Sequence, residues 1–214
     1  MREPMRIVYI VDDDDITRKY FTAVLTTVQL SCRTLESAEA FLLEYDPQQP
    51  GCLLLDVRMS GMTGLELQRQ LNRRGAALPV IFITGHGEIP MVVEALSEGA
   101  FGFLQKPVAT ETLLAQVHKA LDHDASNRAR LLEHEQIQRR FESLTPREQD
   151  VLRLMMEGRS NKVMAGDLLL SQRTVELHRA RVMEKTGSHS LAQLVRMALD
   201  LRIPPPARQR PPAH

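Results

Sequence analysis

Residues that phosphoryl chemistry can use stand at the ends of four short apolar runs in the first half of the sequence. Asp12 and Asp13 follow the first run, Asp56 the second, Thr84 the third and Lys106 the fourth. In an open parallel sheet, side chains at the carboxyl ends of the strands meet at one edge, whatever their separation along the chain. Three carboxylates, a hydroxyl and an ammonium at such an edge predict a pocket in which an aspartate accepts a phosphoryl group.

The predicted acceptor is Asp56, and its chemistry predicts a requirement for magnesium. A carboxylate attacks a phosphoryl group poorly unless the negative charge of that group is neutralised. Mg²⁺ supplies this neutralisation and prefers a few carboxylate oxygens together with waters and phosphate oxygens. Asp12 and Asp13 supply the additional carboxylates. Their charges would otherwise raise the pKa of Asp56, so a bound cation is part of the predicted site.

The hydroxyl and the ammonium have complementary roles in this hypothesis. Lys106 suits one phosphoryl oxygen as a compact positive charge, and Thr84 can donate a hydrogen bond to another. We expect the Lys106–Pro107 peptide bond to be cis. Each residue also has an ordinary interpretation, because the run Asp12–Asp15 could favour a helix start through the helix dipole and Lys106 could be a surface lysine. Their joint placement at four strand ends favours the pocket.

The elements that would position these residues alternate between residues 6 and 122. Short β-branched or aliphatic runs predict strands at 6–11, 30–35, 51–56, 79–84 and 101–105. The amphipathic stretches between them predict helices at 15–28, 37–46, 64–74, 88–98 and 110–122. This order predicts an α/β fold, a five-stranded doubly wound parallel sheet of the flavodoxin type.

Length and charge indicate two domains. The 214 residues have zero net charge, but residues 1–124 hold 11 basic and 17 acidic side chains (−6) and the remainder 16 basic and 10 acidic (+6). An acidic cation-binding domain joined to a basic nucleic-acid-binding domain fits this division. Unevenly charged solvated faces would produce it too.

Cysteine content and hydropathy restrict the class of protein further. Cys32 and Cys52, both beside apolar runs, are the only cysteines, so we expect neither a disulfide framework nor a cysteine metal site. No apolar stretch approaches the ~20 residues needed to cross a bilayer, and the amino terminus lacks the apolar core of a signal peptide. We therefore expect a cytoplasmic protein with no membrane contact.

The chain divides into four predicted segments. They are a first domain at 1–122, a helical linker at 123–142, a helical domain at 143–203 and a Pro-rich tail at 204–214 that we expect to be mobile. The linker lacks Pro and Gly and is either a solvated helix or a lever or pairing surface between domains.

Capping patterns place the helices of the second domain. Thr145–Glu148 predicts a helix start with a capping box and Pro at the first helical position. A short helix follows at 161–167, and Ser171 is expected to cap a third helix that ends near Thr186. Ser190–Gln193 predicts another capping box at the start of a fourth helix.

Residues 173–185 combine an apolar face with a mostly basic outer face. Val175, Val182 and part of Leu177 can pack inward. The outer face holds Arg173, Thr174, Glu176, His178, Arg179, Arg181 and Lys185. A DNA recognition helix needs this division, and Asn161 and Lys162 at the preceding helix start could meet a phosphate. A solvated amphipathic helix would show the same pattern.

Four segments of the first domain are Val11-Asp12-Asp13-Asp14, Leu55-Asp56-Val57-Arg58-Met59, Ile83-Thr84-Gly85-His86-Gly87 and Lys106-Pro107. Together, over residues 6–122, they resemble the receiver domain of two-component response regulators. The resemblance implies that Asp56 takes a phosphoryl group from a sensor histidine kinase. It also implies direct Mg²⁺ binding by Asp13 and the Arg58 carbonyl, binding by Asp12 largely through water, and a paired switch formed by Thr84 and Phe103.

Ser60 departs from this resemblance, since such receivers usually have proline after Met59. We therefore expect a less rigid loop beside Asp56. Arg58 and His86 flank the expected phosphoryl position. We expect both to influence the lifetime of the acyl phosphate by controlling the approach of water.

The second domain carries Leu144-Thr145-Pro146-Arg147-Glu148, Ser160-Asn161-Lys162 and the helix 173–185. These segments resemble the LuxR-type helix-turn-helix, and the whole chain resembles the FixJ/NarL family of transcriptional response regulators, nearest the FixJ branch. The resemblance implies that Glu176, Leu177 and Ala180 face base edges. Backbone phosphates would be held mainly by Asn161, Lys162, Thr174, His178, Arg179 and Arg181, with Arg173 on the same face. Leu169 stands where many members carry glycine in the turn.

The resulting hypothesis is a transcription factor controlled by phosphorylation of Asp56. Its expected partners are a sensor histidine kinase, double-stranded DNA, a second copy of the chain after phosphorylation, and RNA polymerase. We expect no enzymatic activity beyond self-phosphorylation and slow self-dephosphorylation. An aspartyl-phosphate phosphatase of the dehalogenase type is an alternative, but it would need an aspartate two positions after Asp56, where this chain has Arg58. A regulator that acts by protein contact alone is a second alternative.

Overall fold

The computed structural model describes residues 5–85 and 89–203 of the 214. The chain divides into two compact units, Met1–Ala129 and Arg130–His214. The predicted tail at 204–214 and His86 lie outside the described residues. Within the described part, the helices are all too short or too polar to cross a membrane.

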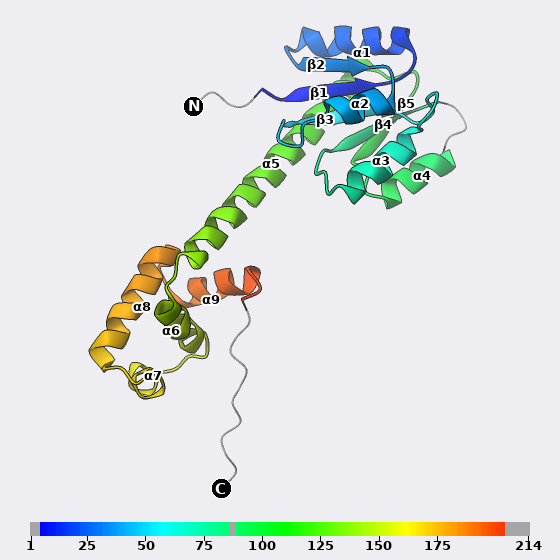
Figure 1. The fold of residues 1–214 in the computed structure, drawn as a ribbon. Helices are drawn as coiled ribbons and strands as arrows, with labels where there is room; N and C mark the ends of the chain where they lie inside the picture. The colour runs from blue at the N-terminus through cyan, green and yellow to red at the C-terminus, as the bar shows by residue number, and fades with distance from the viewer. Residues whose placement is uncertain (1–4, 86–88, 204–214) are drawn as a thin grey trace. The chain divides into compact units, whose positions relative to one another are not determined.

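The first unit is built on a five-stranded parallel sheet (Figure 1). Its strands are β1 (Ile7–Val11), β2 (Ser31–Leu35), β3 (Gly51–Asp56), β4 (Val80–Thr84) and β5 (Gly102–Gln105). They lie in the order β2-β1-β3-β4-β5, with every neighbouring pair parallel. The predicted doubly wound sheet is thereby confirmed, with each strand within one residue of its predicted bounds.

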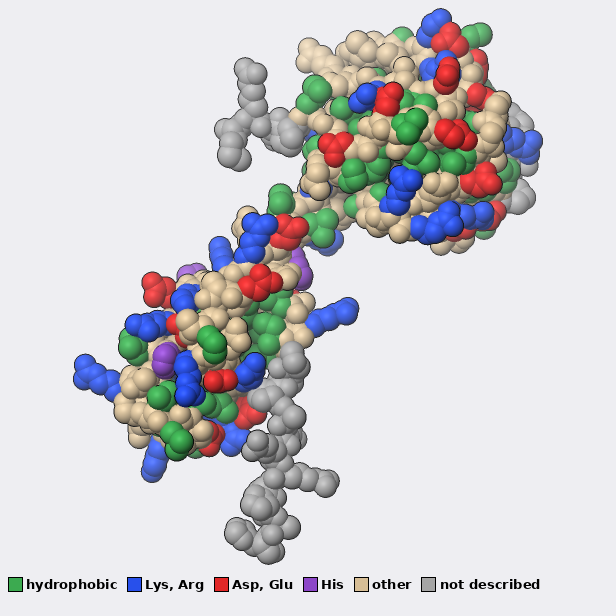
Figure 2. All heavy atoms as spheres, viewed as in Figure 1, with side chains coloured by type: hydrophobic (Ala, Val, Ile, Leu, Met, Phe, Trp, Pro, Cys, Tyr) green, Lys and Arg blue, Asp and Glu red, His purple; other side chains and the backbone are tan. Residues whose placement is uncertain are grey.

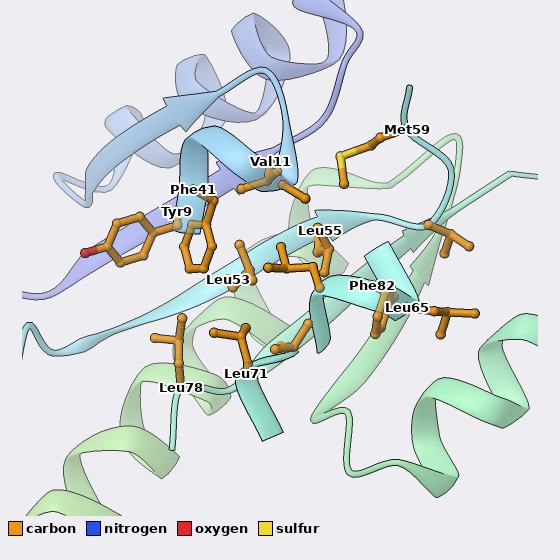
Figure 3. Packing of buried hydrophobic residues seen from close by; sticks show 14 of the residues in the cluster. Tyr9, Val11, Phe41, Leu53, Leu55, Met59, Leu65, Leu71, Leu78 and Phe82 are labelled. Atoms are coloured by element: carbon orange, nitrogen blue, oxygen red, sulfur yellow. The ribbon is translucent and has the colours of Figure 1, made fainter. Parts of the chain in front are cut away.

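Helices cover both faces of the sheet, because alternate residues of each strand point to opposite sides. One face packs against α2 (Ala38–Glu44), α3 (Gly64–Arg73) and α4 (Ile89–Ser97), and the other against α1 (Asp15–Thr27) and the first part of α5 (Thr110–Glu142). Figure 3 shows the first of these layers, in which Tyr9 and Leu53 of the sheet meet Phe41 of α2. Burial on both faces explains why the three central strands β1, β3 and β4 are nearly continuous apolar runs.

Helix α5 joins two segments that the sequence predicts separately, the helix at 110–122 and the linker at 123–142. Near its middle, the fully buried Asp124 accepts hydrogen bonds from the Gly51 backbone at 2.9 Å and from the Arg128 guanidinium. Arg128 also donates to the carbonyls of Gln48 and Gln49. This network fixes α5 to the loop before β3, beyond the predicted end of the first domain at 122.

The second unit contains α6 (Pro146–Met156), α7 (Asn161–Leu168), α8 (Gln172–Thr186) and α9 (Leu191–Asp200). Their apolar faces enclose one core around Val151, Met164, Val175, Val182 and Leu194. From the linker region of α5, Phe141 is buried in this core and Ile137 packs against it. Leu131 and Leu132, by contrast, are more than half exposed.

The helix starts in this unit follow the predicted caps with one correction. Thr145 and Glu148 form the predicted capping box, and Ser171 caps α8. At α9, Ser190 accepts from the Gln193 backbone, but the Gln193 side chain accepts from the His189 N–H at 2.9 Å. The predicted reciprocal box at Ser190 is therefore wrong, because the glutamine oxygen bonds the residue before the cap.

The turn between α7 and α8 has a left-handed residue. Leu169 adopts φ 56° and ψ 44° and is 91% exposed. This conformation costs a residue with a side chain about 1–2 kcal/mol, and glycine adopts it with no steric penalty. Leu169, which stands where many members carry glycine, therefore has a backbone conformation that favours glycine.

An ion pair between a buried carboxylate and a partly exposed lysine joins α6 to α8. The Glu148 carboxylate is 2% exposed and accepts hydrogen bonds from Lys185 Nζ at 2.6 Å and from the Thr145 backbone at 2.9 Å. Burial alone would raise the pKa of Glu148, but these donors outweigh it and lower the pKa from 4.5 to about 2. A carboxylate with a lowered pKa stabilises the fold above its ordinary pKa, and this contribution disappears as the pH falls toward the folded value.

We predict that Glu148→Gln lowers the free energy of unfolding of the helical unit by about 1–3 kcal/mol at pH 7, because the Lys185 ammonium loses its charged acceptor. The deficit should shrink as the pH falls from 4.5 toward 2. Hydrogen exchange of α6 amides in the intact chain measures both effects. Glu184→Gln, an exposed substitution on α8, is the matched control. A deficit that stays constant with pH would contradict the role of the ion pair.

Candidate functional site

The sheet brings the predicted pocket residues to one edge. Asp56 and Thr84 are the last residues of β3 and β4, and Asp12 and Lys106 immediately follow β1 and β5. The parallel register pairs Val11 with Leu55, Asp56 with Ile83, and Thr84 with Gln105, so these strand ends are level. Side chains separated by up to 94 positions in the sequence therefore meet.

Lys106 lies between two aspartates of this edge. Its Nζ donates to Asp56 Oδ1 at 2.6 Å and to Asp12 Oδ2 at 2.9 Å. Asp12 is 2% exposed and Asp56 8% exposed. The Lys106–Pro107 peptide bond is cis, as predicted. The arrangement is a largely buried cluster of two carboxylates around one ammonium.

Backbone groups orient the remaining oxygens of the two carboxylates. Asp56 Oδ2 accepts from the Arg58 N–H at 2.8 Å, and Asp12 Oδ1 accepts from the Asp14 N–H at 2.8 Å. Asp14 itself caps α1. The sequence allowed the aspartate run to be either part of the pocket or an acidic helix start. Both occur, since Asp12 lies in the pocket and Asp14 caps the helix.

Asp13 is exposed and bonded to the loop after β3. Its Oδ2 accepts from both the backbone N–H and the hydroxyl of Ser60, at 2.9 and 3.0 Å. The sequence identified Ser60 as a departure from the usual proline, but only the structure identifies it as a partner of Asp13. Across residues 5–85 and 89–203, no three His, Cys, Asp or Glu side chains are grouped closely enough to hold a metal ion.

The cluster shifts the proton affinities of its members. Burial raises the pKa of Asp56, and the neighbouring Asp12 carboxylate adds to this, while Lys106 and the Arg58 N–H counteract it. Burial lowers the pKa of Lys106, but its hydrogen bonds to Asp56 and Asp12 outweigh this and raise it. Lys106 therefore remains an ammonium beside a carboxylate whose ionised form is poorly solvated.

The two predicted switch residues lie on neighbouring strands. Thr84 is buried, and its hydroxyl donates to the Leu104 carbonyl at a long 3.4 Å. Phe103 is 46% exposed on the adjacent strand. The side chain of Arg58 is also exposed.

The second predicted site lies on α7 and α8. The outer face of α8 carries exposed side chains at Arg173, Glu176, Leu177, Ala180 and Arg181, while Thr174, His178 and Arg179 are half-buried. On α7, Lys162 is exposed, and Asn161 donates from Nδ2 to Glu176 Oε1 at 3.3 Å. Lys and Arg side chains are frequent on the visible face of this unit (Figure 2). Val175 and Val182 are fully buried, as predicted.

Comparison with known protein families identifies both units. Residues 8–118 match the response regulator receiver domain, and residues 142–198 match the bacterial regulatory proteins of the luxR family. The chain therefore belongs to the response regulators that join a receiver domain to a LuxR-type DNA-binding domain, and it is a regulator of transcription.

Individual relatives support the predicted FixJ branch. The chain is 41% identical over 198 residues to the transcriptional regulatory protein FixJ of Azorhizobium caulinodans, covering 92% of this chain and 94% of that protein. It is 38% identical over 202 residues to the response regulator protein TodT of Pseudomonas putida, covering 94% and 89%.

Two solved structures cover nearly the whole chain. The response regulator StyR matches with a TM-score of 0.84 and 40% identity, covering 92% of this chain and 99% of that chain. Full-length FixJ from B. japonicum matches with a TM-score of 0.58 and 33% identity, covering 94% and 99%.

We predict that Asp56→Asn stabilises the receiver unit by about 1 kcal/mol at pH 7, because it removes a poorly solvated charge while Lys106 keeps Asp12 as its partner. An aspartate with a raised pKa destabilises the fold only where it is ionised. The gain should therefore vanish below about pH 4, where the carboxyl is neutral in both the folded and unfolded states.

Hydrogen exchange of β3 and β4 amides in the intact chain measures this stability. Glu36→Gln, which removes an exposed carboxylate from the same unit, is the control. A variant that is less stable than the wild type at pH 7 would show that Asp56 is held favourably as an anion.

Proposed function

We propose that phosphorylation of Asp56 by a sensor histidine kinase switches this regulator. A carboxylate oxygen of Asp56 bonds to phosphorus while the phosphorus–nitrogen bond of the donor phosphohistidine breaks, and the electron pair returns to the imidazole. The observation that carries the proposal is the Lys106 ammonium 2.6 Å from Asp56 Oδ1. A lysine at this distance can pair with an oxygen of the arriving phosphoryl group.

The oxygen donors of the pocket are chemically of the kind that magnesium prefers, although Asp13 is bonded to Ser60 and is not grouped with Asp12 and Asp56. Asp12, Asp13 and Asp56 offer carboxylates, and the Arg58 carbonyl offers a further oxygen, which is the donor set that Mg²⁺ prefers. Asp12 and Asp56 already converge on one positive charge, the Lys106 ammonium. When bound, Mg²⁺ neutralises charge on the phosphoryl group. In the proposed assignment Asp13 and the Arg58 carbonyl are direct ligands, and Asp12 acts largely through water.

The proposed switch uses Thr84 and Phe103. The Thr84 hydroxyl exchanges its 3.4 Å bond to the Leu104 carbonyl for a phosphoryl oxygen, and a bond of this length is weak enough to give up. Phe103 then turns inward from its exposed position. This local rearrangement biases the receiver toward a conformation that dimerises.

The proposed output is sequence-specific DNA binding by the dimer. Helix α8 enters the major groove, and its basic residues hold backbone phosphates on either side. We assign residues 1–122 to the receiver, 123–142 to the linker and 143–203 to the output domain. A twofold dimer would bind two half-sites and recruit RNA polymerase to the promoter.

We predict that acetyl phosphate with Mg²⁺ adds one phosphoryl group to the wild-type protein and increases its dimer fraction. Asp56→Asn should abolish both effects, because an amide is not a nucleophile toward phosphorus. Lys106→Ala should reduce adduct formation by about 10-fold or more, because it removes the charge that pairs with a phosphoryl oxygen. Intact-protein mass spectrometry and analytical ultracentrifugation measure these outcomes.

Asp122→Asn, which changes an aspartate whose side chain is 78% exposed, is the control and should behave as the wild type. An adduct on Asp56→Asn would mean that the acceptor is misassigned. Steady phosphatase turnover of many equivalents would instead favour the dehalogenase-type alternative.

We also predict that the intact protein binds duplex DNA with an affinity that falls steeply with salt, because Lys and Arg release counterions from phosphates. Arg181→Ala and Lys162→Ala should each reduce the slope of log affinity against log salt by about 1. Arg73→Ala, an exposed change on α3, should leave the slope unchanged. Fluorescence anisotropy at several salt concentrations measures this slope. Binding that is absent, or that does not depend on salt, would favour a regulator acting by protein contact alone.

A further inference from the structure

Glu176 is an acid on a helix face whose charged side chains are otherwise basic. Its side chain is exposed on α8, with Arg173 one turn before it and Arg179 one turn after it. Among the described residues, however, Glu176 forms no ion pair with a lysine or arginine. A carboxylate directed toward DNA is repelled by the phosphates, and a hydrogen-bond donor on the DNA would offset this repulsion.

The partner of Glu176 is a neutral amide from the neighbouring helix. Asn161 Nδ2 donates to Glu176 Oε1 at 3.3 Å. Asn161 is the first residue of α7, and Ser160 caps that helix by accepting from the Val163 N–H. The two helices that carry the contact are held together, because Met164 of α7 and Val175 of α8 are buried in one core. The amide therefore holds the carboxylate in one direction and leaves Oε2 available.

The chemistry of the major groove determines what Oε2 can bind. The amino groups of cytosine and adenine are the hydrogen-bond donors that base edges present there. The adenine amino group lies beside N7, an acceptor that repels a carboxylate, whereas the cytosine amino group has no acceptor beside it on its own base. A fixed carboxylate therefore favours cytosine, and an amide such as glutamine would favour adenine.

We propose that Glu176 reads a cytosine amino group in each half-site and that Asn161 is the positioning residue that directs it. This inference rests on the proposed DNA binding by α8 and deepens it by naming the base class. It also gives Asn161 a role different from the phosphate contact that the family resemblance implies. The pair thus contributes base discrimination, whereas the surrounding arginines contribute affinity.

The test is selection of duplexes from a random-sequence pool by the intact, acetyl phosphate-treated protein, followed by affinity measurements on the selected site. We expect a C·G pair at one position of each half-site, with a discrimination of about 10-fold or more against other pairs. Glu176→Gln should lose this cytosine preference and gain adenine at the same position. Asn161→Ala should weaken the cytosine preference without a gain of adenine.

Lys162→Ala is the matched control, because Lys162 follows Asn161 at the start of α7 and its side chain is exposed. It should reduce affinity and salt slope while leaving the cytosine preference intact, whereas Asn161→Ala should leave the salt slope intact. If a variant merely lost helix structure, both its cytosine preference and its salt slope would fall. Circular dichroism of each variant checks folding independently.

The outcomes separate this inference from the function on which it rests. Absence of any salt-dependent duplex binding by the wild type would overturn the proposed DNA-binding function itself. Selection of a clear operator in which Glu176→Gln changes no position would overturn only the cytosine assignment. An unchanged preference in Asn161→Ala would overturn the positioning role.

Discussion

Two buried aspartates share one lysine ammonium at the carboxyl edge of the sheet, and the first unit is organised around this contact. Asp12 and Asp56 are each almost removed from solvent, and Lys106 Nζ lies within 2.9 Å of both. Charges in such a place are tolerated only when they are paired and hydrogen-bonded. The parallel order of β1, β3 and β5 supplies these charges from three separate parts of the chain.

The same contact connects stability with chemistry. Burial raises the pKa of Asp56, so the Asp56 anion, which is the proposed nucleophile, is held at a cost that the apolar layers on both faces of the sheet offset. The next two strands carry Thr84, whose hydroxyl makes a weak hydrogen bond at the end of β4, and Phe103, which is 46% exposed in β5. In the proposed switch, these are the two groups that move when Asp56 is phosphorylated. The helical unit has its own ion pair between α6 and α8, in which the buried Glu148 carboxylate accepts from Lys185.

Features that depend on local pattern were predictable from the sequence. The central strands β3 and β4 are buried on both faces and are continuous apolar runs, so their ends, and with them Asp56 and Thr84, could be located. The Thr145 capping box and the Ser171 cap followed from spacing alone. Where two local partners compete, the pattern failed, since the Gln193 side chain bonds the N–H of His189 and not that of Ser190.

Contacts between distant segments were not predictable, because nothing in their local sequence distinguishes them. The hydrogen bond from Gly51 to Asp124 spans 73 positions, and the bond from Ser60 to Asp13 spans 47. The Asn161–Glu176 pair spans only 15, yet it depends on how α7 and α8 pack. The predicted roles of the site residues are a separate matter, since position in the fold does not establish what a residue binds.

Carbon-13 NMR of the aspartate carboxyl groups during a Mg²⁺ titration of the intact protein tests the central claim most directly. If these strand ends form one cation-assisted pocket, the resonances of Asp12, Asp13 and Asp56 should shift together with a single affinity, while that of the exposed Asp122 stays in place. A titration in which Asp56 does not respond, or in which Asp122 responds equally, would contradict the pocket as we describe it.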